Sequence, residues 1–157
     1  MSTIERVGVV GCGLMGSGIA EVCARAGLDV VVREVDATAA EAGLARVTTS
    51  LDRAVRSGKL GEAERDSALR RIRIVTDLSE LAERQLVIEA VMEDEALKTA
   101  VFAALDTVVQ DDEAILASNT SSIPIMKLGM ATRRPAQVIG VHFFNPVPVL
   151  PLSLIHI

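Results

Sequence analysis

The chain is poor in aromatic residues and has no long apolar stretch. Its 157 residues include three Phe, no Trp and no Tyr, so its core must be built from Val, Ile, Leu, Ala and Met. No run reaches the roughly 18 apolar residues that a membrane span needs. The first residues also lack the apolar region of a secretory signal. We therefore expect neither a membrane partner nor a secreted protein.

Cysteine and positive charge are scarce as well. Cys12 and Cys23 have neither metal-ligand nor redox-motif spacing, so they predict a reduced, cytoplasmic protein without a metal site. For Cys12, a redox-sensing role is the alternative to a small residue that fills a loop. The net charge of -5 argues against a partner of the nucleic-acid class.

What the chain does have is a series of short apolar runs separated by amphipathic segments. The runs are continuous rather than alternating, which is typical of strands buried on both faces of a parallel sheet. The sequence therefore predicts an α/β fold, a Rossmann-type doubly wound parallel sheet with helices on both faces. The expected strands are 7–10, 30–32, 72–75, 86–89, 114–117 and 138–142, and the expected helices are 14–26, 37–57, 62–70 and 94–109.

A G-x-G-x-x-G pattern stands between the first predicted strand and the first predicted helix. Gly11 permits a tight turn, Gly13 lets the backbone approach a pyrophosphate, and Gly16 lets the helix pack against the strand. The start of the helix, with Leu14 and Met15, offers free N–H groups and a positive dipole to phosphates. The position of the pattern favours a dinucleotide site over a glycine turn without a ligand.

An acidic residue is expected at the end of the second strand of such a site. Glu34 and Asp36 follow Gly16 by 18 and 20 residues, and Glu34 is the better candidate because it stands at the strand end. Such an acid binds the ribose hydroxyls of NAD and repels the 2′-phosphate of NADP. A solvated loop charge is the alternative for either acid. Arg33 could bind the phosphate, so NADP stays open beside NAD.

Polar residues also follow the fifth and sixth predicted strands, at the edge where open parallel sheets bind ligands. Imidazole can take the proton of an alcohol near neutral pH, which makes His142 a candidate base. The amide of Asn119 and the hydroxyl of Ser121 can hydrogen-bond a substrate oxygen and a nicotinamide. Helix capping by Asn119 and Ser121, and a structural histidine, are the alternatives.

Four segments make the interpretation more specific. Residues 13–20, 89–93, 118–122 and 142–149 closely resemble the L-3-hydroxyacyl-CoA dehydrogenase family, and most of all its bacterial 3-hydroxybutyryl-CoA members. The resemblance covers residues 4 to about 150. It implies an NAD-dependent oxidoreductase that interconverts L-3-hydroxyacyl-CoA and 3-ketoacyl-CoA in fatty acid or butanoate metabolism.

The resemblance also implies the roles of particular residues. His142 is then the catalytic base, Ser121 contacts substrate and cofactor, and Asn145 lies near the nicotinamide, although Asn145 could simply form a turn before proline. Glu93 and Lys98 match positions that contact the cofactor. For these two residues the alternative is a solvated charge on a helix.

The helical stretch 46–59 is basic, with Arg46, Arg53, Arg56 and Lys59, and it matches the region along which the family binds coenzyme A. Ser50 matches a contacting position. The second match falls on Ser57, where the family can carry Lys, so Arg56 or Lys59 could substitute for it. Cations near the mouth of the site suit the polyanionic coenzyme. An exposed helix face without a ligand remains the alternative.

The end of the chain departs from the family pattern. The family places a glutamate, which pairs with the catalytic histidine, twelve residues after it, and here that position is Leu154. We therefore expect an NAD-binding domain at 1–150, a non-native tail at 151–157, and the absence of the family's C-terminal helical domain. By the resemblance, that domain forms the homodimer of the full-length enzyme, covers the substrate and supplies an active-site Asn. Because this cover and the glutamate at position 154 are both missing, we expect the fragment to be inactive alone.

Two other functions stay open. One is a related dehydrogenase of another small β-hydroxy acid, against which Asn119, Ser121, His142, Asn145 and the basic helix all weigh. The other is a binding module that holds NAD without turnover, which Leu154 favours. The sequence leaves the preferred acyl-chain length open.

Overall fold

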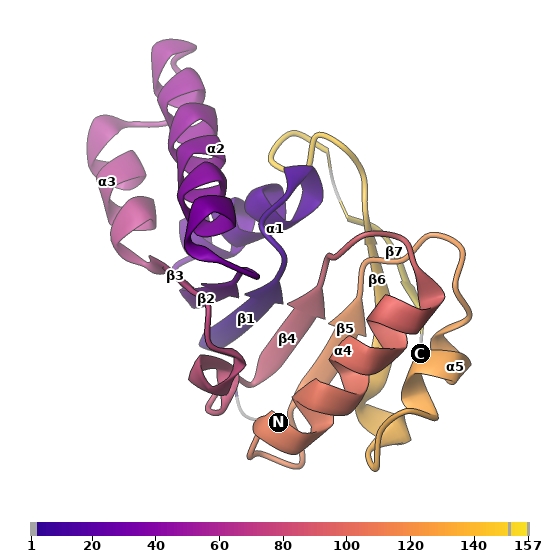
Figure 1. The fold of residues 1–157 in the computed structure, drawn as a ribbon. Helices are drawn as coiled ribbons and strands as arrows, with labels where there is room; N and C mark the ends of the chain where they lie inside the picture. Colours follow the sequence, from indigo (N-terminus) through magenta and orange to yellow (C-terminus); the bar gives the residue numbers. More distant parts are fainter. Residues whose placement is uncertain (1–2, 151, 157) are drawn as a thin grey trace.

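The fold is a seven-stranded sheet with the strand order β3-β2-β1-β4-β5-β6-β7, seen here in a computed structural model (Figure 1). The structure describes residues 3–150 and 152–156, the latter as backbone alone. The first six strands are parallel, and β7 runs antiparallel to β6. The strands are β1 (Arg6–Val10), β2 (Asp29–Arg33), β3 (Ile72–Val75), β4 (Leu86–Glu89), β5 (Ile115–Ser118), β6 (Val138–Phe143) and β7 (Leu152–His156).

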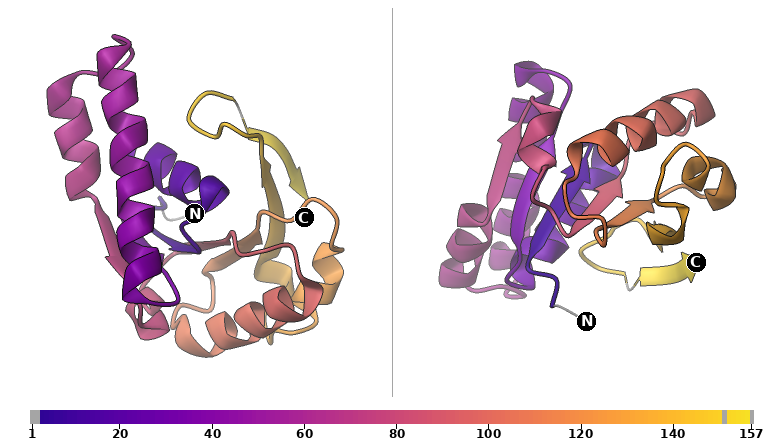
Figure 2. Two further views of the ribbon diagram at one scale, coloured as in Figure 1. Left: turned by 45° about the horizontal axis from the view of Figure 1, so that its top comes forward. Right: turned by 90° about the horizontal axis from the view of Figure 1, so that it is seen from below.

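Helices cover both faces of the sheet, as Figures 1 and 2 show. Side chains within one strand alternate between two cores: Val30 and Val32 pack with α1 and α2, whereas Val31 packs with α4. The predicted doubly wound Rossmann-type fold is therefore confirmed. The helices are α1 (Leu14–Arg25), α2 (Ala37–Arg56), α3 (Glu62–Arg70), α4 (Glu95–Val108) and α5 (Ile125–Gly129), with short 3₁₀ turns η1 (Leu78–Leu81) and η2 (Pro135–Gln137).

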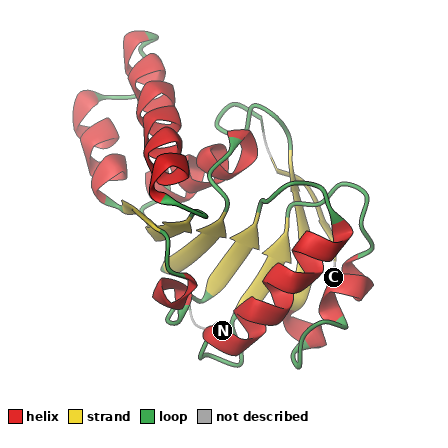
Figure 3. Ribbon diagram, in the orientation of Figure 1, coloured by secondary structure: helices red, strands yellow, loops and turns green. Residues whose placement is uncertain are grey.

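The sequence-based prediction missed two elements, α5 and β7. Figure 3 shows that β7 extends the sheet at the end of the chain, where a tail was expected. The six expected strands are present and parallel, and β7 is an additional antiparallel strand that was not predicted. The register of β7 sets position 154 directly opposite His142. No helix in the described part of the chain is long and apolar enough to cross a membrane.

The topology defines where a ligand can bind. The chain proceeds from β1 to β2 and β3 on one side, and then returns to β4 on the other side of β1. At such a reversal the loops after neighbouring strands diverge and leave a crevice outside their carboxyl ends. The loops that follow β1, β4, β5 and β6 carry the residues that the sequence singled out.

Candidate functional site

The glycine loop between β1 and α1 contains glycines that are required for two different reasons. Gly11 has φ +93°, and a Cβ on Gly16 would lie 1.9 Å from the carbonyl oxygen of Gly11. These two positions need glycine because of the protein's own backbone. At Gly13, by contrast, no described residue other than its chain neighbours has an atom within 4 Å of a Cβ. That open space fits close approach by a ligand.

The start of α1 offers the donors that a pyrophosphate needs. Gly13 is the N-cap and supplies no side-chain acceptor. The first intrahelical bond runs from Ser17 N–H to the carbonyl of Gly13 at 3.0 Å, so the amides of Leu14, Met15 and Gly16 precede it. Together with the helix dipole, these amides fit the diphosphate of a dinucleotide.

The two candidate acids have different environments. Glu34 lies against the glycine loop, where its carboxylate accepts hydrogen bonds from the N–H groups of Cys12 and Val35. Asp36 caps α2 by accepting from Ala39 N–H at 2.8 Å, so it has a local structural role. The preference for Glu34 as the ribose-binding acid therefore agrees with the geometry. Arg33 donates from Nε to the carbonyl of Thr76 at 3.3 Å.

Cys12 packs inside this loop rather than facing a partner. Its side chain is fully buried, and a Cβ on Gly43 of α2 would lie 2.7 Å from its sulfur. Burial and the negative charge of Glu34 raise the pKa of the Cys12 thiol to about 11, although the positive charge of Arg46 acts in the opposite direction. The thiol therefore stays protonated near neutral pH, which favours the packing role over a redox sensor.

We expect Glu34→Gln to weaken NADH binding by roughly 1 to 3 kcal/mol, the cost of losing a charged hydrogen bond. The same change should narrow the difference in affinity between NADH and NADPH, because glutamine carries no charge that repels the 2′-phosphate. Titration of both nucleotides into wild type and variant measures the two effects. Unchanged NADH affinity would remove Glu34 from the site.

A second group of predicted residues surrounds a cavity of about 380 Å³ at the carboxyl edge of the sheet. It is formed by the ends of β4, β5 and β6 together with α1 and α4. The structure thus brings together residues that are separated by up to 130 positions in the chain. Its polar lining consists of Glu93, Lys98, Asn119, Ser121, His142 and Asn145, and Met15 of the glycine helix joins them.

The cavity walls are held by specific contacts. The side-chain oxygen of Asn119 accepts a hydrogen bond from Phe143 N–H at 3.0 Å, which ties the loop after β5 to the segment that carries His142. The ring of His142 meets that of Phe144 edge-on, with centroids 5.7 Å apart. Ser121 and His142 also border a neighbouring cavity of about 380 Å³. A substrate at this edge can therefore reach both side chains.

Lys98 is not the solvated helix charge that the alternative interpretation assumed. It is only 1% exposed, and its Nζ lies 2.6 Å from Glu89 and 3.6 Å from Glu93. Sequence reasoning missed Glu89; the available signal was a charged residue that ends an otherwise apolar strand. Glu93 is 41% exposed and accepts hydrogen bonds from the hydroxyls of Thr120 and Ser122.

The surroundings of Glu93 keep its carboxylate ionised. Partial burial by itself raises its pKa, but hydrogen bonds from Thr120 and Ser122 and the charge of Lys98 outweigh that effect and lower the pKa below its ordinary value. The cavity therefore presents one anionic side chain beside one cationic side chain, together with the neutral polar groups of Asn119 and Ser121.

Two of the predicted coenzyme A residues, Ser50 and Lys59, lie along a groove between α1, α2 and residues 145–149. Two adjoining cavities, of about 520 and 310 Å³, share Ser50 and Arg53 as lining residues. Lys59 lines the smaller cavity, which is the outer end of the groove, whereas Arg56 lines neither cavity. Ser50 and Lys59 thus line the same cavity, and Arg53 of the same basic stretch lines both cavities. The groove leads from these cations toward Asn145.

The chain was compared with protein families, with curated proteins and with solved structures. The family described as "3-hydroxyacyl-CoA dehydrogenase, NAD binding domain" matches residues 6–155, beyond the expected limit near residue 150. The 3-hydroxybutyryl-CoA dehydrogenase of Mycobacterium tuberculosis is 62% identical over 149 residues, which cover 95% of this chain and 52% of the relative.

Two crystal structures share the fold over nearly the whole chain. M. tuberculosis FadB2 superposes with a TM-score of 0.94 at 61% identity, covering 96% of this chain and 53% of the other. The (S)-3-hydroxybutyryl-CoA dehydrogenase PaaH1 from Ralstonia eutropha gives a TM-score of 0.92 at 45% identity, covering 98% and 53%. The chain thus spans about half the length of the curated relatives that it matches.

Proposed function

We propose that this chain forms the cofactor-binding half of a dehydrogenase that acts on 3-hydroxyacyl-CoA. The chain belongs to the 3-hydroxyacyl-CoA dehydrogenase family, whose NAD-binding domain it represents. The cofactor is NAD. The observation that carries the proposal is the cavity in which His142, Ser121 and Lys98 meet beside the glycine helix. The names of the similar proteins support L-3-hydroxybutyryl-CoA as the substrate and the 3-ketoacyl-CoA as the product.

Each polar residue of the cavity has a role in this reaction. Bound NAD supplies the hydride acceptor. His142 accepts the proton of the 3-hydroxyl group, and negative charge then develops on that oxygen. Ser121 donates a hydrogen bond to the same oxygen and stabilises the charge. Asn119 holds the segment of His142 through its bond with Phe143 N–H.

Position 154 has a direct relation to the proposed base. Leu154 and His142 are partners across the antiparallel pair of β6 and β7. Directly opposite residues in such a pair have Cβ atoms about 4.5 to 5.5 Å apart. A carboxylate at position 154 could therefore orient the imidazole and stabilise its protonated form, as the carboxylate of a catalytic triad does.

The groove along α2 is proposed to hold the coenzyme A part of the substrate. Arg53 and Lys59 supply positive charge at its outer end, and Asn145 lies at the end nearest the reacting groups. Phosphates at the outer end would gain charge-assisted hydrogen bonds. We further propose that the full-length enzyme is cytoplasmic and forms a homodimer through the half that its relatives possess beyond this chain.

The test joins this chain to the second half of the M. tuberculosis relative. Acetoacetyl-CoA-dependent oxidation of NADH is measured for the joined protein, with Leu or Glu at position 154, and for the chain alone. We expect turnover by the joined protein, faster with Glu at 154, and none by the chain alone. A joined protein that binds NADH but turns over no acetoacetyl-CoA would contradict the proposal and favour an NAD-binding module or another β-hydroxy acid substrate.

A further inference from the structure

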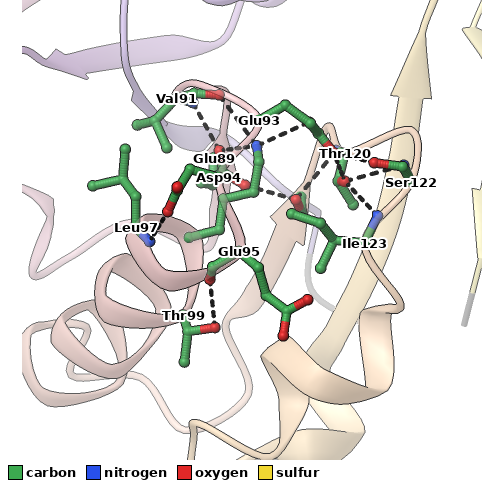
Figure 4. A network of polar contacts seen from close by, with 12 residues as sticks. Glu89, Val91, Glu93, Asp94, Glu95, Leu97, Thr99, Thr120, Ser122 and Ile123 are labelled. Atoms are coloured by element: carbon green, nitrogen blue, oxygen red, sulfur yellow. Dashed lines mark hydrogen bonds and ion pairs between the residues drawn. The ribbon is translucent and has the colours of Figure 1, made fainter.

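Glu89 is a buried carboxylate that the proposed reaction does not use. It ends β4 and is 0% exposed, and its ion-pair partner Lys98 is 1% exposed. Its two oxygens accept from Lys98 Nζ at 2.6 Å, from Val91 N–H at 2.7 Å and from the Ser118 hydroxyl at 2.6 Å. Figure 4 shows this network, in which Glu89 lies close to Val91 and Glu93. One carboxylate thus joins α4, the loop after β4 and the end of β5.

The ion pair is a poor device for stability alone. Removing two charges from water costs several kcal/mol per ion, which offsets most of their attraction, and apolar side chains of similar volume often join two elements as well or better. Lys98 lines the cavity at the carboxyl edge of the sheet, beside Glu93. Because the proposed reaction takes place there, this cavity is called the catalytic cavity below. At its wall the charged Lys98 can contact a polar ligand, which an apolar side chain in its place could not do.

The contacts of Lys98 leave its ammonium group able to bind a ligand. An ammonium has three N–H donors. Among the described residues, Glu89 at 2.6 Å and the carbonyl of Val91 at 3.2 Å are its hydrogen-bond acceptors, while Glu93 lies farther off at 3.6 Å. Glu89 therefore fixes the position of the ammonium, and the third donor has Glu93, at 3.6 Å, as its nearest further partner among the described residues.

A second branch of the network fixes the loop after β5. The Ser118 hydroxyl that donates to Glu89 also accepts from Thr120 N–H at 3.2 Å. The Thr120 hydroxyl donates to Glu93 and accepts from the N–H of Ile123 at 3.0 Å. The loop that carries Asn119 and Ser121 is thus anchored to Glu89 on one side and to Glu93 on the other.

We propose that Glu89 is the positioning residue for the nicotinamide riboside end of the cofactor. It holds the Lys98 ammonium and the loop of residues 118–122 in the one arrangement that receives this end. The inference rests on the proposed function, because it takes the catalytic cavity as the nicotinamide side of the site. Glu89 acts through these neighbours and does not itself touch the cofactor.

The test compares two ligands in the variant Glu89→Gln. Glutamine keeps the shape of the side chain, but it replaces an acceptor by donors and leaves Lys98 without its closest counter-charge. NADH and ADP are titrated calorimetrically into wild type and variant. ADP lacks the nicotinamide riboside and reaches only the glycine loop and Glu34. We expect NADH affinity to fall about tenfold, the usual effect of a charged hydrogen bond, while ADP affinity stays within about twofold.

Asp106→Asn is the matched control. Asp106 is a buried carboxylate on the same helix, and it pairs with Arg134 at 2.9 Å, away from the cavity. This variant should lose thermal stability yet keep both affinities. If Glu89→Gln behaves like it, or loses NADH and ADP affinity together, Glu89 is merely structural and the proposal is overturned.

Ser118→Ala is the second variant, which tests the same proposal if Glu89→Gln does not fold. It removes one donor to Glu89 without leaving a buried charge alone, and it should weaken NADH about fivefold while sparing ADP. Equal NADH affinity for Ser118→Ala and wild type would then count against the proposal. A wild-type chain that fails to bind NADH would instead contradict the assignment of the cofactor site.

Discussion

His142→Gln, made in the chain joined to a second half, is expected to lower kcat by about two to four orders of magnitude. His142 lines the catalytic cavity together with Ser121 and Lys98, so it is placed to accept the substrate proton. Glutamine is similar in size and polar, but it cannot take that proton. Because the base acts in the transition state and not in substrate binding, KM should change little.

Binding and turnover separate this role from a structural one. NADH affinity of His142→Gln should stay within about twofold of wild type, since the glycine loop and Glu34 are untouched. Asp106→Asn serves again as the control and should keep its turnover. A His142→Gln protein with wild-type kcat would end the assignment of the base, and joint loss of NADH affinity would indicate that the histidine only supports the fold.

The central strands of the parallel sheet could be predicted because they are buried on both faces. Apolar runs such as residues 86–88 favour a buried strand, and the predicted bounds of β4, 86–89, agree with the observed ones. β7 could not be predicted in this way. Its residues pair with the free edge of β6, and that partner is specified by tertiary structure rather than by any local pattern.

The site residues at strand ends could be predicted for a related reason. The carboxyl ends of parallel strands meet at one edge, so Ser121 and His142 were expected to lie near each other, and they line the same cavities. The burial of Lys98 could not be foreseen, because it depends on Glu89 of a different element. A lysine on a helix otherwise resembles a solvated charge.

Helical geometry explains why Arg53 lines the groove and Arg56 does not. Residues three and four apart share a helix face, so Arg46, Ser50 and Arg53 point the same way, and all three line the groove. Arg56 does not line it. The spacing from Ser50 therefore indicates which arginine of the helix faces the groove.

Gly13→Val should abolish most NADH binding while leaving the fold intact. Gly13 has φ -70° and ψ -158°, an extended conformation that does not require glycine, and apart from its chain neighbours no described residue has an atom within 4 Å of a Cβ there. The added side chain therefore fills space that the pyrophosphate needs. We expect affinity to fall on the order of a hundredfold, as overpacking of a close contact implies. Gly16→Ala is the contrasting control, because its Cβ would clash with the carbonyl of Gly11 at 1.9 Å and destabilise the loop itself.

The central claim is that this chain is an NAD-binding domain that binds its cofactor through the glycine loop. Its most direct test is calorimetric titration of NADH into wild type and Gly13→Val, together with the thermal unfolding of both proteins. The predicted result is binding by wild type, near-complete loss of binding by Gly13→Val, and equal unfolding temperatures. Equal NADH affinity of the two folded proteins, or no binding by either, would contradict it.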